Sequence, residues 1–99
     1  MKANYNTVFK EIIQVVANGN TALKVMEVLE KQGLVTGKLT EPIQWIFNFQ
    51  GGGWNTVMAV SLQEAQKKVK EEYGTSTPLL HSVRPCTEED YNSHMRNFD

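Results

Sequence analysis

Cysteine, long apolar runs and net charge are all scarce in this sequence, and each shortage excludes a class of protein. Cys86 is the only cysteine, so no disulfide can form within the chain, which is typical of a reducing compartment. No apolar run approaches the ~18 residues that span a bilayer, and the first residues lack the apolar core of a secretory signal. We therefore expect a cytoplasmic protein, in a bacterium or in an infected host cell.

The formal net charge is −1, so no overall field draws the chain toward nucleic acid or an anionic membrane. The one asymmetry is a weakly positive body over residues 1–86, followed by an acidic tail over residues 87–99. The hydrophobic fraction of 40% and the charged fraction of 21% are typical of a globular protein. A length of 99 residues predicts a single domain over residues 1–99.

Residues with metal or nucleophile chemistry are also few. His81, Cys86 and His94 are five and eight positions apart, which matches no compact zinc pattern. A catalytic pair of Cys86 and His94 is conceivable, but a lone cysteine in a small protein is more often a packing residue. The acidic residues 88–90 suit the first turn of a helix, where carboxylates complement the helix dipole. We predict no catalytic residue, no metal site and no cofactor, and we expect that the protein is not an enzyme.

Three of the seven glycines are consecutive, from Gly51 to Gly53. A phosphate-binding loop would need a helix directly after the glycines and usually a lysine followed by serine or threonine. No lysine lies between Lys38 and Lys67, and the residues after the glycines alternate as in a strand. The glycines therefore predict a hairpin turn between strands at Ile43–Phe49 and Trp54–Ser61.

The hairpin register is predicted from the burial of aromatic residues. If the loop is Gln50–Gly53, Phe49 lies opposite Trp54 and the large apolar residues of both strands share one face. A three-residue loop would mix the two sets, so burial favours the first register. The predicted apolar face holds Ile43, Trp45, Phe47, Phe49, Trp54, Met58 and Val60, and the other face holds Gln44, Ile46, Asn48, Asn55, Val57 and Ala59.

Helical periodicity and end signals predict four helices around these strands. The first is capped by Asn6 or Thr7. It ends at Gly19 in a left-handed conformation, and Asn20 caps the second, which runs to about Gln32. The third helix opens with a capping box, Ser61 and Glu64, and ends at Gly74. A short strand, Leu79–Arg84, then stops at Pro85, and Thr87 caps a last helix that carries Tyr91, Met95 and Phe98.

The order of elements is therefore ααββαβα, which predicts an α+β fold. An N-terminal helix pair over residues 1–33 precedes a ββαβ core over residues 43–84, whose antiparallel three-stranded sheet has the order 2-1-3. A short acidic helix over residues 87–99 ends the chain. We expect the third helix to cover the aromatic face of the sheet, and which face the N-terminal pair covers stays open.

For function, we expect a non-enzymatic binding module that acts through protein–protein interaction. Small near-neutral domains without catalytic motifs are often accessory or modulator proteins of phages and mobile elements. A second hypothesis is a homo-oligomer that holds a small molecule or nucleotide between its subunits. The candidate binding residues are Trp45 and Trp54, which would stack on a ligand or contact a partner, and Lys67, Lys70 and Arg84, which would contact a phosphate.

A third hypothesis comes from residues 22–37 and the hairpin that follows them. This stretch resembles the helix, turn and wing of winged-helix proteins, and Leu29, Gly33, Leu34 and Val35 carry the resemblance. It implies a nucleic-acid binder whose second helix reads the groove. The sequence departs from the pattern because two helices, not three, precede the hairpin, and its tip has no arginine or lysine for a phosphate.

Overall fold

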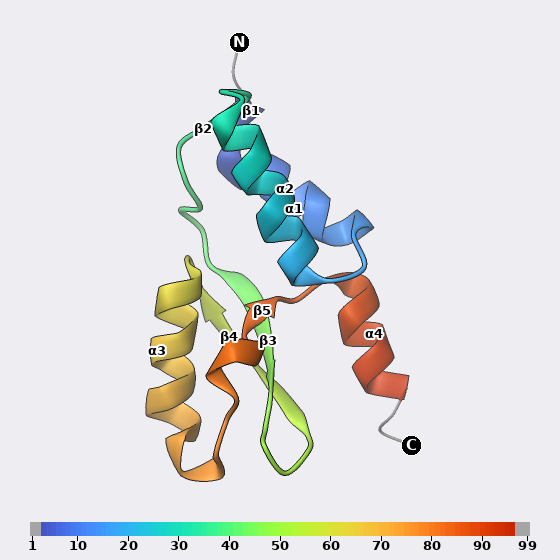
Figure 1. The fold of residues 1–99 in the computed structure, drawn as a ribbon, viewed down its shortest axis with the longest axis vertical. Helices are drawn as coiled ribbons and strands as arrows, with labels where there is room; N and C mark the ends of the chain where they lie inside the picture. The colour runs from blue at the N-terminus through green and yellow to red at the C-terminus, as the bar shows by residue number, and fades with distance from the viewer. Residues whose placement is uncertain (1–2, 97–99) are drawn as a thin grey trace.

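The structure, a computed structural model that describes residues 3–96, is an α+β fold with four α-helices and a three-stranded antiparallel sheet in that range (Figure 1). The predicted fold class is confirmed, since a helix pair precedes a ββαβ unit and a short helix. The helices are α1 (Tyr5–Val15), α2 (Gly19–Lys31), α3 (Leu62–Tyr73) and α4 (Glu88–Arg96). The strands are β1 (Ala3–Asn4), β2 (Val35–Thr36), β3 (Ile43–Asn48), β4 (Trp54–Ala59) and β5 (Arg84–Pro85).

The first two helices begin two residues earlier than the sequence predicts. Asn4 caps α1 and Asn18 caps α2, because each side-chain oxygen accepts the backbone N–H three residues further on. The prediction that Gly19 ends the first helix in a left-handed conformation is wrong. Gly19 instead opens α2 and is buried against β5, where an added Cβ would lie 2.0 Å from the carbonyl oxygen of Pro85.

The segment between α2 and β3 contains one short strand, β2. β2 pairs in parallel with β1, and this small ladder joins the start of α1 to the segment after α2. It holds the two ends of the helix pair together at the N-terminal tip of the molecule (Figure 1).

The main sheet has the order β4-β3-β5, which confirms the predicted order 2-1-3. The third strand is shorter than predicted, because a 3₁₀ turn at Leu80–Ser82 interrupts the segment Leu79–Arg84. Pro85 does not stop the strand but lies within it, opposite Trp45. Proline is tolerated there because β5 is an edge strand, where a missing backbone N–H does not remove a hydrogen bond between two strands.

The hairpin is confirmed, but its predicted register is wrong by one residue. Asn48, not Phe49, lies opposite Trp54, and Gly52 and Gly53 turn the chain with φ of +101° and +90°. The side chains on the face that packs on α3, called the α3 face, are Ile43, Trp45, Phe47, Asn55, Val57 and Ala59. Those on the opposite face, called the α4 face, are Gln44, Ile46, Asn48, Trp54, Thr56 and Met58.

The last two helices start where predicted. The Ser61 hydroxyl accepts the N–H of Glu64, and the Thr87 hydroxyl accepts the N–H of Asp90. α3 covers the α3 face of the sheet with buried Ala65 and Val69, whereas α4 lies against the other face (Figure 1). Phe98, which the sequence places in the last helix, lies outside the described residues.

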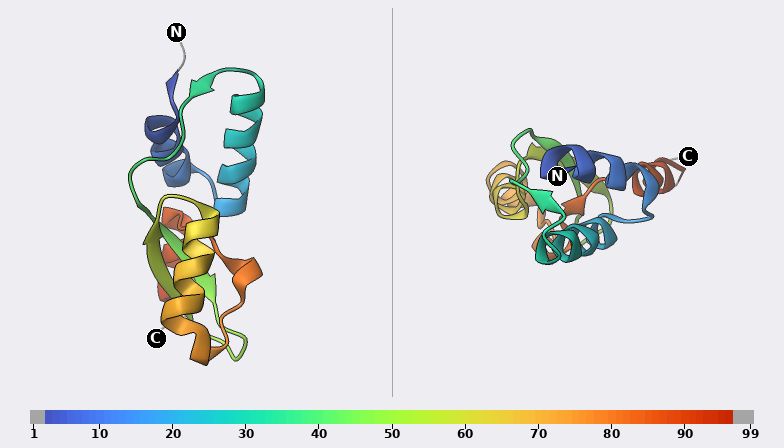
Figure 2. Two further views of the ribbon diagram at one scale, coloured as in Figure 1. Left: turned by 90° about the vertical axis from the view of Figure 1, so that its left-hand side faces the viewer. Right: turned by 90° about the horizontal axis from the view of Figure 1, so that it is seen from above.

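The helix pair packs at the end of the sheet where β3 begins (Figure 2). Phe9 of α1 and Met26 of α2 join Ile43 and Trp45 in one buried cluster, so the pair continues the core of the α3 face. The resulting molecule is elongated, with extents of 46 × 28 × 18 Å. Within residues 3–96, none of the helices has the length and hydropathy needed to cross a membrane.

Candidate functional site: the surface around α4

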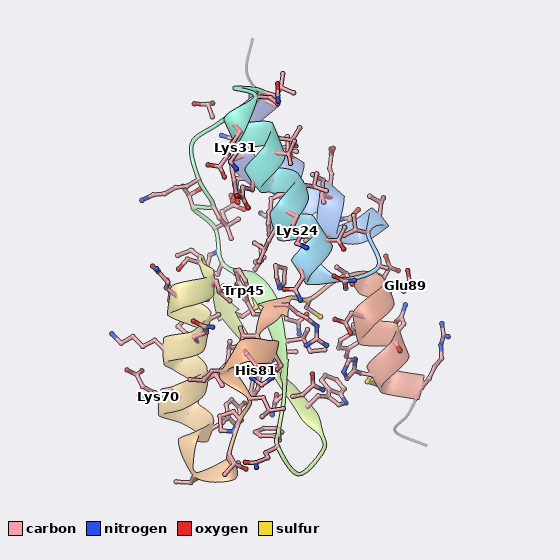
Figure 3. All side chains as sticks on the ribbon, viewed as in Figure 1. Lys24, Lys31, Trp45, Lys70, His81 and Glu89 are labelled. Atoms are coloured by element: carbon pink, nitrogen blue, oxygen red, sulfur yellow. The ribbon has the colours of Figure 1, made fainter. Side chains whose placement is uncertain are left out.

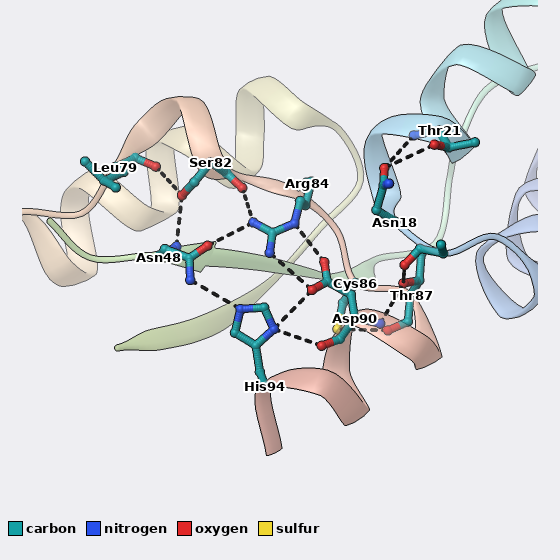
Figure 4. Close-up of polar contacts among 11 residues, drawn as sticks. Asn18, Thr21, Asn48, Leu79, Ser82, Arg84, Cys86, Thr87, Asp90 and His94 are labelled. Atoms are coloured by element: carbon teal, nitrogen blue, oxygen red, sulfur yellow. Dashed lines mark hydrogen bonds and ion pairs between the residues drawn. The ribbon is translucent and has the colours of Figure 1, made fainter. Parts of the chain in front are cut away.

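A network of polar side chains fastens α4 to the sheet (Figure 4). Arg84 of β5 donates from Nε to Asp90 Oδ2 at 2.7 Å and from Nη2 to Asp90 Oδ1 at 3.2 Å. Both side chains are largely buried, at 14% and 10% exposure. The two-pronged, charge-assisted contact fixes both the position and the rotation of the first turn of α4.

His94 extends this network by one helical turn. Its Nδ1 lies 2.8 Å from the carbonyl oxygen of Asp90 and 3.0 Å from Asp90 Oδ1, so Nδ1 is the donor nitrogen. Nε2 lies 3.3 Å from Nδ2 of Asn48, whose Oδ1 accepts Arg84 Nη1 at 3.1 Å. Because Arg84 fixes the orientation of the Asn48 amide, Nδ2 of Asn48 is the donor toward Nε2 of His94.

The N-terminal end of α4 is also tied to the helix pair. The Thr87 side chain is fully buried, and its hydroxyl donates to the carbonyl oxygen of Ala17 at 3.0 Å while it caps α4. Burying a hydroxyl is tolerated only when it is bonded, and here it both donates and accepts. α4 is therefore held by the sheet and by the α1–α2 loop together.

The thiol of Cys86 lies beside this network but lacks the features of a nucleophile. The side chain is 9% exposed, and its sulfur lies 3.8 Å from the carbonyl oxygen of Thr87. Burial, together with the nearby Asp90 carboxylate, raises the pKa of Cys86 to about 11. The thiol is therefore protonated at neutral pH, whereas a nucleophilic cysteine needs a lowered pKa.

Aromatic residues continue from the sheet onto the exposed side of α4. The ring of Trp54 meets the rings of Tyr91 and His94 edge-on, at centroid distances of 5.7 and 5.5 Å. Tyr91 is 36% exposed and Met95, one turn further on, is 46% exposed. We call Trp54, Tyr91 and Met95, together with the exposed Glu88 and Glu89 of the first turn, the α4 surface.

The structure does not bring the predicted binding residues together. Trp45 is 1% exposed and donates Nε1 to the carbonyl oxygen of Ala59 at 2.9 Å, so it is a core residue. Lys67 and Lys70 are exposed on α3, and Figure 3 shows Lys70 pointing into solvent. Arg84 lies on the other face of the sheet, under α4, with its guanidinium bound to Asp90. Of the predicted set, only Trp54 belongs to the α4 surface.

Trp45 also forms one wall of a cavity of about 230 Å³ between the helix pair and the start of α3. The walls are mainly apolar, with Phe9, Leu39 and Leu62 among them. Burial, and secondarily the Glu30 carboxylate, raises the pKa of Tyr5 at this cavity. Its hydroxyl is therefore neutral at physiological pH.

The lysines that would contact nucleic acid in the winged-helix interpretation lie on α2. Lys24 and Lys31 are both exposed along that helix (Figure 3), and Lys31 pairs with Glu27 at 3.3 Å. They are separated from Lys67 and Lys70, which belong to α3. The described residues thus present two small groups of lysines on different elements.

Sequence reasoning assigned Tyr91 and Met95 to the last helix but did not select them as site residues. Their spacing of four positions in an otherwise polar helix was the available signal. What the sequence did not show is that Trp54 would lie against them.

Among residues 3–96, the His, Cys, Asp and Glu side chains form no group of three that could hold a metal ion. Comparisons of this chain with protein families, with curated proteins and with solved structures find no match.

Proposed function

We propose that the protein acts by binding another protein through the α4 surface, without catalysing a reaction. The observation that carries this proposal is an aromatic and apolar ridge, in which Tyr91 and Met95 stay exposed on a firmly held helix and the half-buried Trp54 of β4 lies beside Tyr91. Tryptophan, tyrosine and methionine are enriched at the centres of protein interfaces.

The charges around the ridge define the kind of partner. Glu88 and Glu89 are exposed at the N-terminal end of α4, and Figure 3 shows Glu89 pointing outward. A partner that places apolar side chains on the ridge and lysine or arginine beside Glu88 and Glu89 would complement the α4 surface in both shape and charge. An acidic partner would be repelled.

Preorganisation supports the same proposal. The Arg84–Asp90–His94 network holds α4 in place before any partner arrives, so little ordering of the backbone is needed on binding. The composition favours a particular role for such a binding protein. It is that of a small cytoplasmic accessory or modulator protein, of the kind carried by phages and mobile elements.

The test compares two matched substitutions of exposed apolar helix residues by lysine. Met95→Lys changes the α4 surface, and Val28→Lys changes α2, where Val28 is 56% exposed. A stoichiometric complex would first be purified from the host with the wild-type chain. We expect Met95→Lys to weaken it at least about tenfold and Val28→Lys to leave it unchanged.

Two outcomes would contradict the proposal. One is a complex that survives Met95→Lys but is lost with Val28→Lys, which would place the interface on the helix pair. The other is the absence of any stoichiometric partner. The double variant Glu88→Lys/Glu89→Lys adds a charge test, because it should weaken the complex more at low salt than at high salt.

A further inference from the structure

The strand β4 forms a free edge of the sheet, and the register fixes which of its backbone groups point outward. In β3, the carbonyl oxygens of Gln44 and Asn48 accept N–H groups from the β5 side, at 2.9 and 2.8 Å. The backbone groups of the alternate residues of β3 therefore face β4, as Trp45 does opposite Val57. It follows that the N–H and C=O groups of Thr56 and Met58 point away from the sheet.

The described side chains that meet these outward groups are polar. The Thr56 N–H donates to Oδ1 of Asn55 at 2.8 Å, and the Met58 carbonyl accepts Nζ of Lys68 at 2.7 Å. A side-chain oxygen thus takes the place of a neighbouring strand's carbonyl, and an ammonium takes the place of its N–H. Lys68 is 42% exposed, so this contact can be exchanged for another at small cost.

A groove lies beside this edge. It has a volume of about 520 Å³, and β4 and α3 form its walls with Thr56, Met58, Lys68, Glu71, Glu72 and Tyr73. Seen from the side of α3, β4 is the outermost strand, and no other described element flanks it (Figure 2). An extended strand in this groove would meet the outward backbone groups of Thr56 and Met58.

We propose that the strand that fits this edge is β4 of a second copy of the chain, paired antiparallel across a twofold axis at Thr56. In this register Thr56 lies opposite the partner subunit's Thr56 and exchanges both backbone hydrogen bonds with it. Met58 then lies beside the partner's Trp54 on the α4 face, where a thioether–aromatic contact is favourable. Two three-stranded sheets become one continuous sheet.

Charge complementarity is what favours a second copy over an unrelated strand. α3 runs antiparallel to β4, so Lys68 lies near the Met58 end of the edge and Glu72 near its other end. The twofold axis reverses this order in the second copy, and each Lys68 therefore faces the partner's Glu71 and Glu72. Neither glutamate has an ion pair within the described residues, so both are available for the second lysine.

This proposal does not rest on the proposed function, because it needs no other protein, although Trp54 of the α4 surface also borders the dimer edge. Its first test uses the purified chain alone. Sedimentation equilibrium from about 1 μM to about 1 mM should show a reversible monomer–dimer transition. Amide hydrogen exchange by NMR should show that the N–H groups of Thr56 and Met58 become protected as the dimer forms, whereas that of Val57 is protected throughout.

Substitutions at the edge separate this interface from any other. Thr56→Pro removes an N–H that β3 does not use, and it should weaken the dimer about tenfold or more. Thr56→Val keeps the N–H and the strand preference, and it should dimerise like the wild type. Glu72→Lys places like charges across the axis and should also weaken the dimer, most clearly at low salt.

Lys67→Glu, like Glu72→Lys, reverses one charge of α3, but on the solvent-exposed side of the helix, and it serves as the control. A chain that stays monomeric at about 1 mM would overturn the proposal. So would a dimer in which the Thr56 N–H exchanges freely, or one that Glu72→Lys leaves intact, since each would place the contact elsewhere. Because Glu72 is exposed, that result stands even if Thr56→Pro fails to fold.

Discussion

At the scale of single residues, Gly19 is the glycine with the least room for a side chain. It lies in the first turn of α2, against the backbone of Pro85, and a Cβ there would be 2.0 Å from the Pro85 oxygen. We expect Gly19→Ala to lower the free energy of unfolding by about 3 kcal/mol or more, because backbone on both sides must move apart. Urea denaturation measures this. Gly51→Ala, which meets no atom within 4 Å, is the control and should change stability by less than about 0.5 kcal/mol.

Cys86 gives a pH-dependent prediction. Its pKa rises from 9.0 to about 11 on folding, because burial disfavours the thiolate. The folded state therefore binds the proton more tightly, and this contribution to stability is complete below pH 9 and is lost as the pH rises toward 11. We expect the urea midpoint to fall between pH 9 and pH 11, and to fall less in Cys86→Ala. An equal fall in the variant would show that other groups cause it.

At the scale of elements, the ion pair of Arg84 and Asp90 is the central contact between α4 and the sheet. Asp90→Asn leaves the largely buried Arg84 without its carboxylate, and it should cost about 2–4 kcal/mol. We expect α4 to detach from the sheet, so that chymotrypsin cleaves after Tyr91 and the emission of Trp54 shifts to the red. Glu89→Gln removes an exposed charge from the same turn and is the control. If Asp90→Asn leaves the protease resistance of α4 unchanged, the ion pair does not hold the helix.

Element by element, the sequence predicted the caps of α3 and α4 but not those of α1 and α2, and it predicted the hairpin but not its register. Ser61 and Thr87 cap their helices as expected, because capping depends on residues three apart. The predicted register is wrong at Trp54, because it places all large aromatic residues of the hairpin on one buried face. Tyr91 and His94 cover Trp54 on the other face, and these residues come almost forty positions later. The alternation of apolar and polar residues within a strand cannot show that residues so far away in the sequence will cover its other face.

The same limit, that local patterns do not show which distant elements meet, explains why the predicted binding residues do not form one site. Trp45 is a candidate binding residue in the sequence because tryptophan is a large contact residue, but α3 and the helix pair bury it. Arg84 was selected as a phosphate contact, and its charge is instead used within the fold by Asp90. Both outcomes depend on which elements meet in space, and periodicity along the chain does not determine this. Pro85 is likewise predicted to end the strand, because the sequence does not show that β5 is an edge strand, where proline is tolerated.

At the scale of the whole molecule, the helix pair and the sheet share one buried cluster despite the elongated shape. Phe9 and Met26 contribute to it from the helices, and Ile43 and Trp45 contribute from β3. Two separate cores would allow each half to unfold alone, whereas a shared core couples them. The expectation of a single domain over residues 1–99 therefore becomes a statement about cooperativity.

Met26→Ala tests that cooperativity, because it damages the core from the helix side only. Met26 is fully buried, so the change should cost about 3 kcal/mol, whereas Val28→Ala, at 56% exposure on the same helix, should cost almost nothing. In a Trp54→Phe background, Trp45 is the only indole and reports on the sheet. We expect far-UV circular dichroism and Trp45 fluorescence to shift together to the same lower urea midpoint, since loss of the helix pair removes part of the cover of Trp45. A helical signal that melts before the fluorescence changes would show two independent units, and the single-domain prediction would then be wrong.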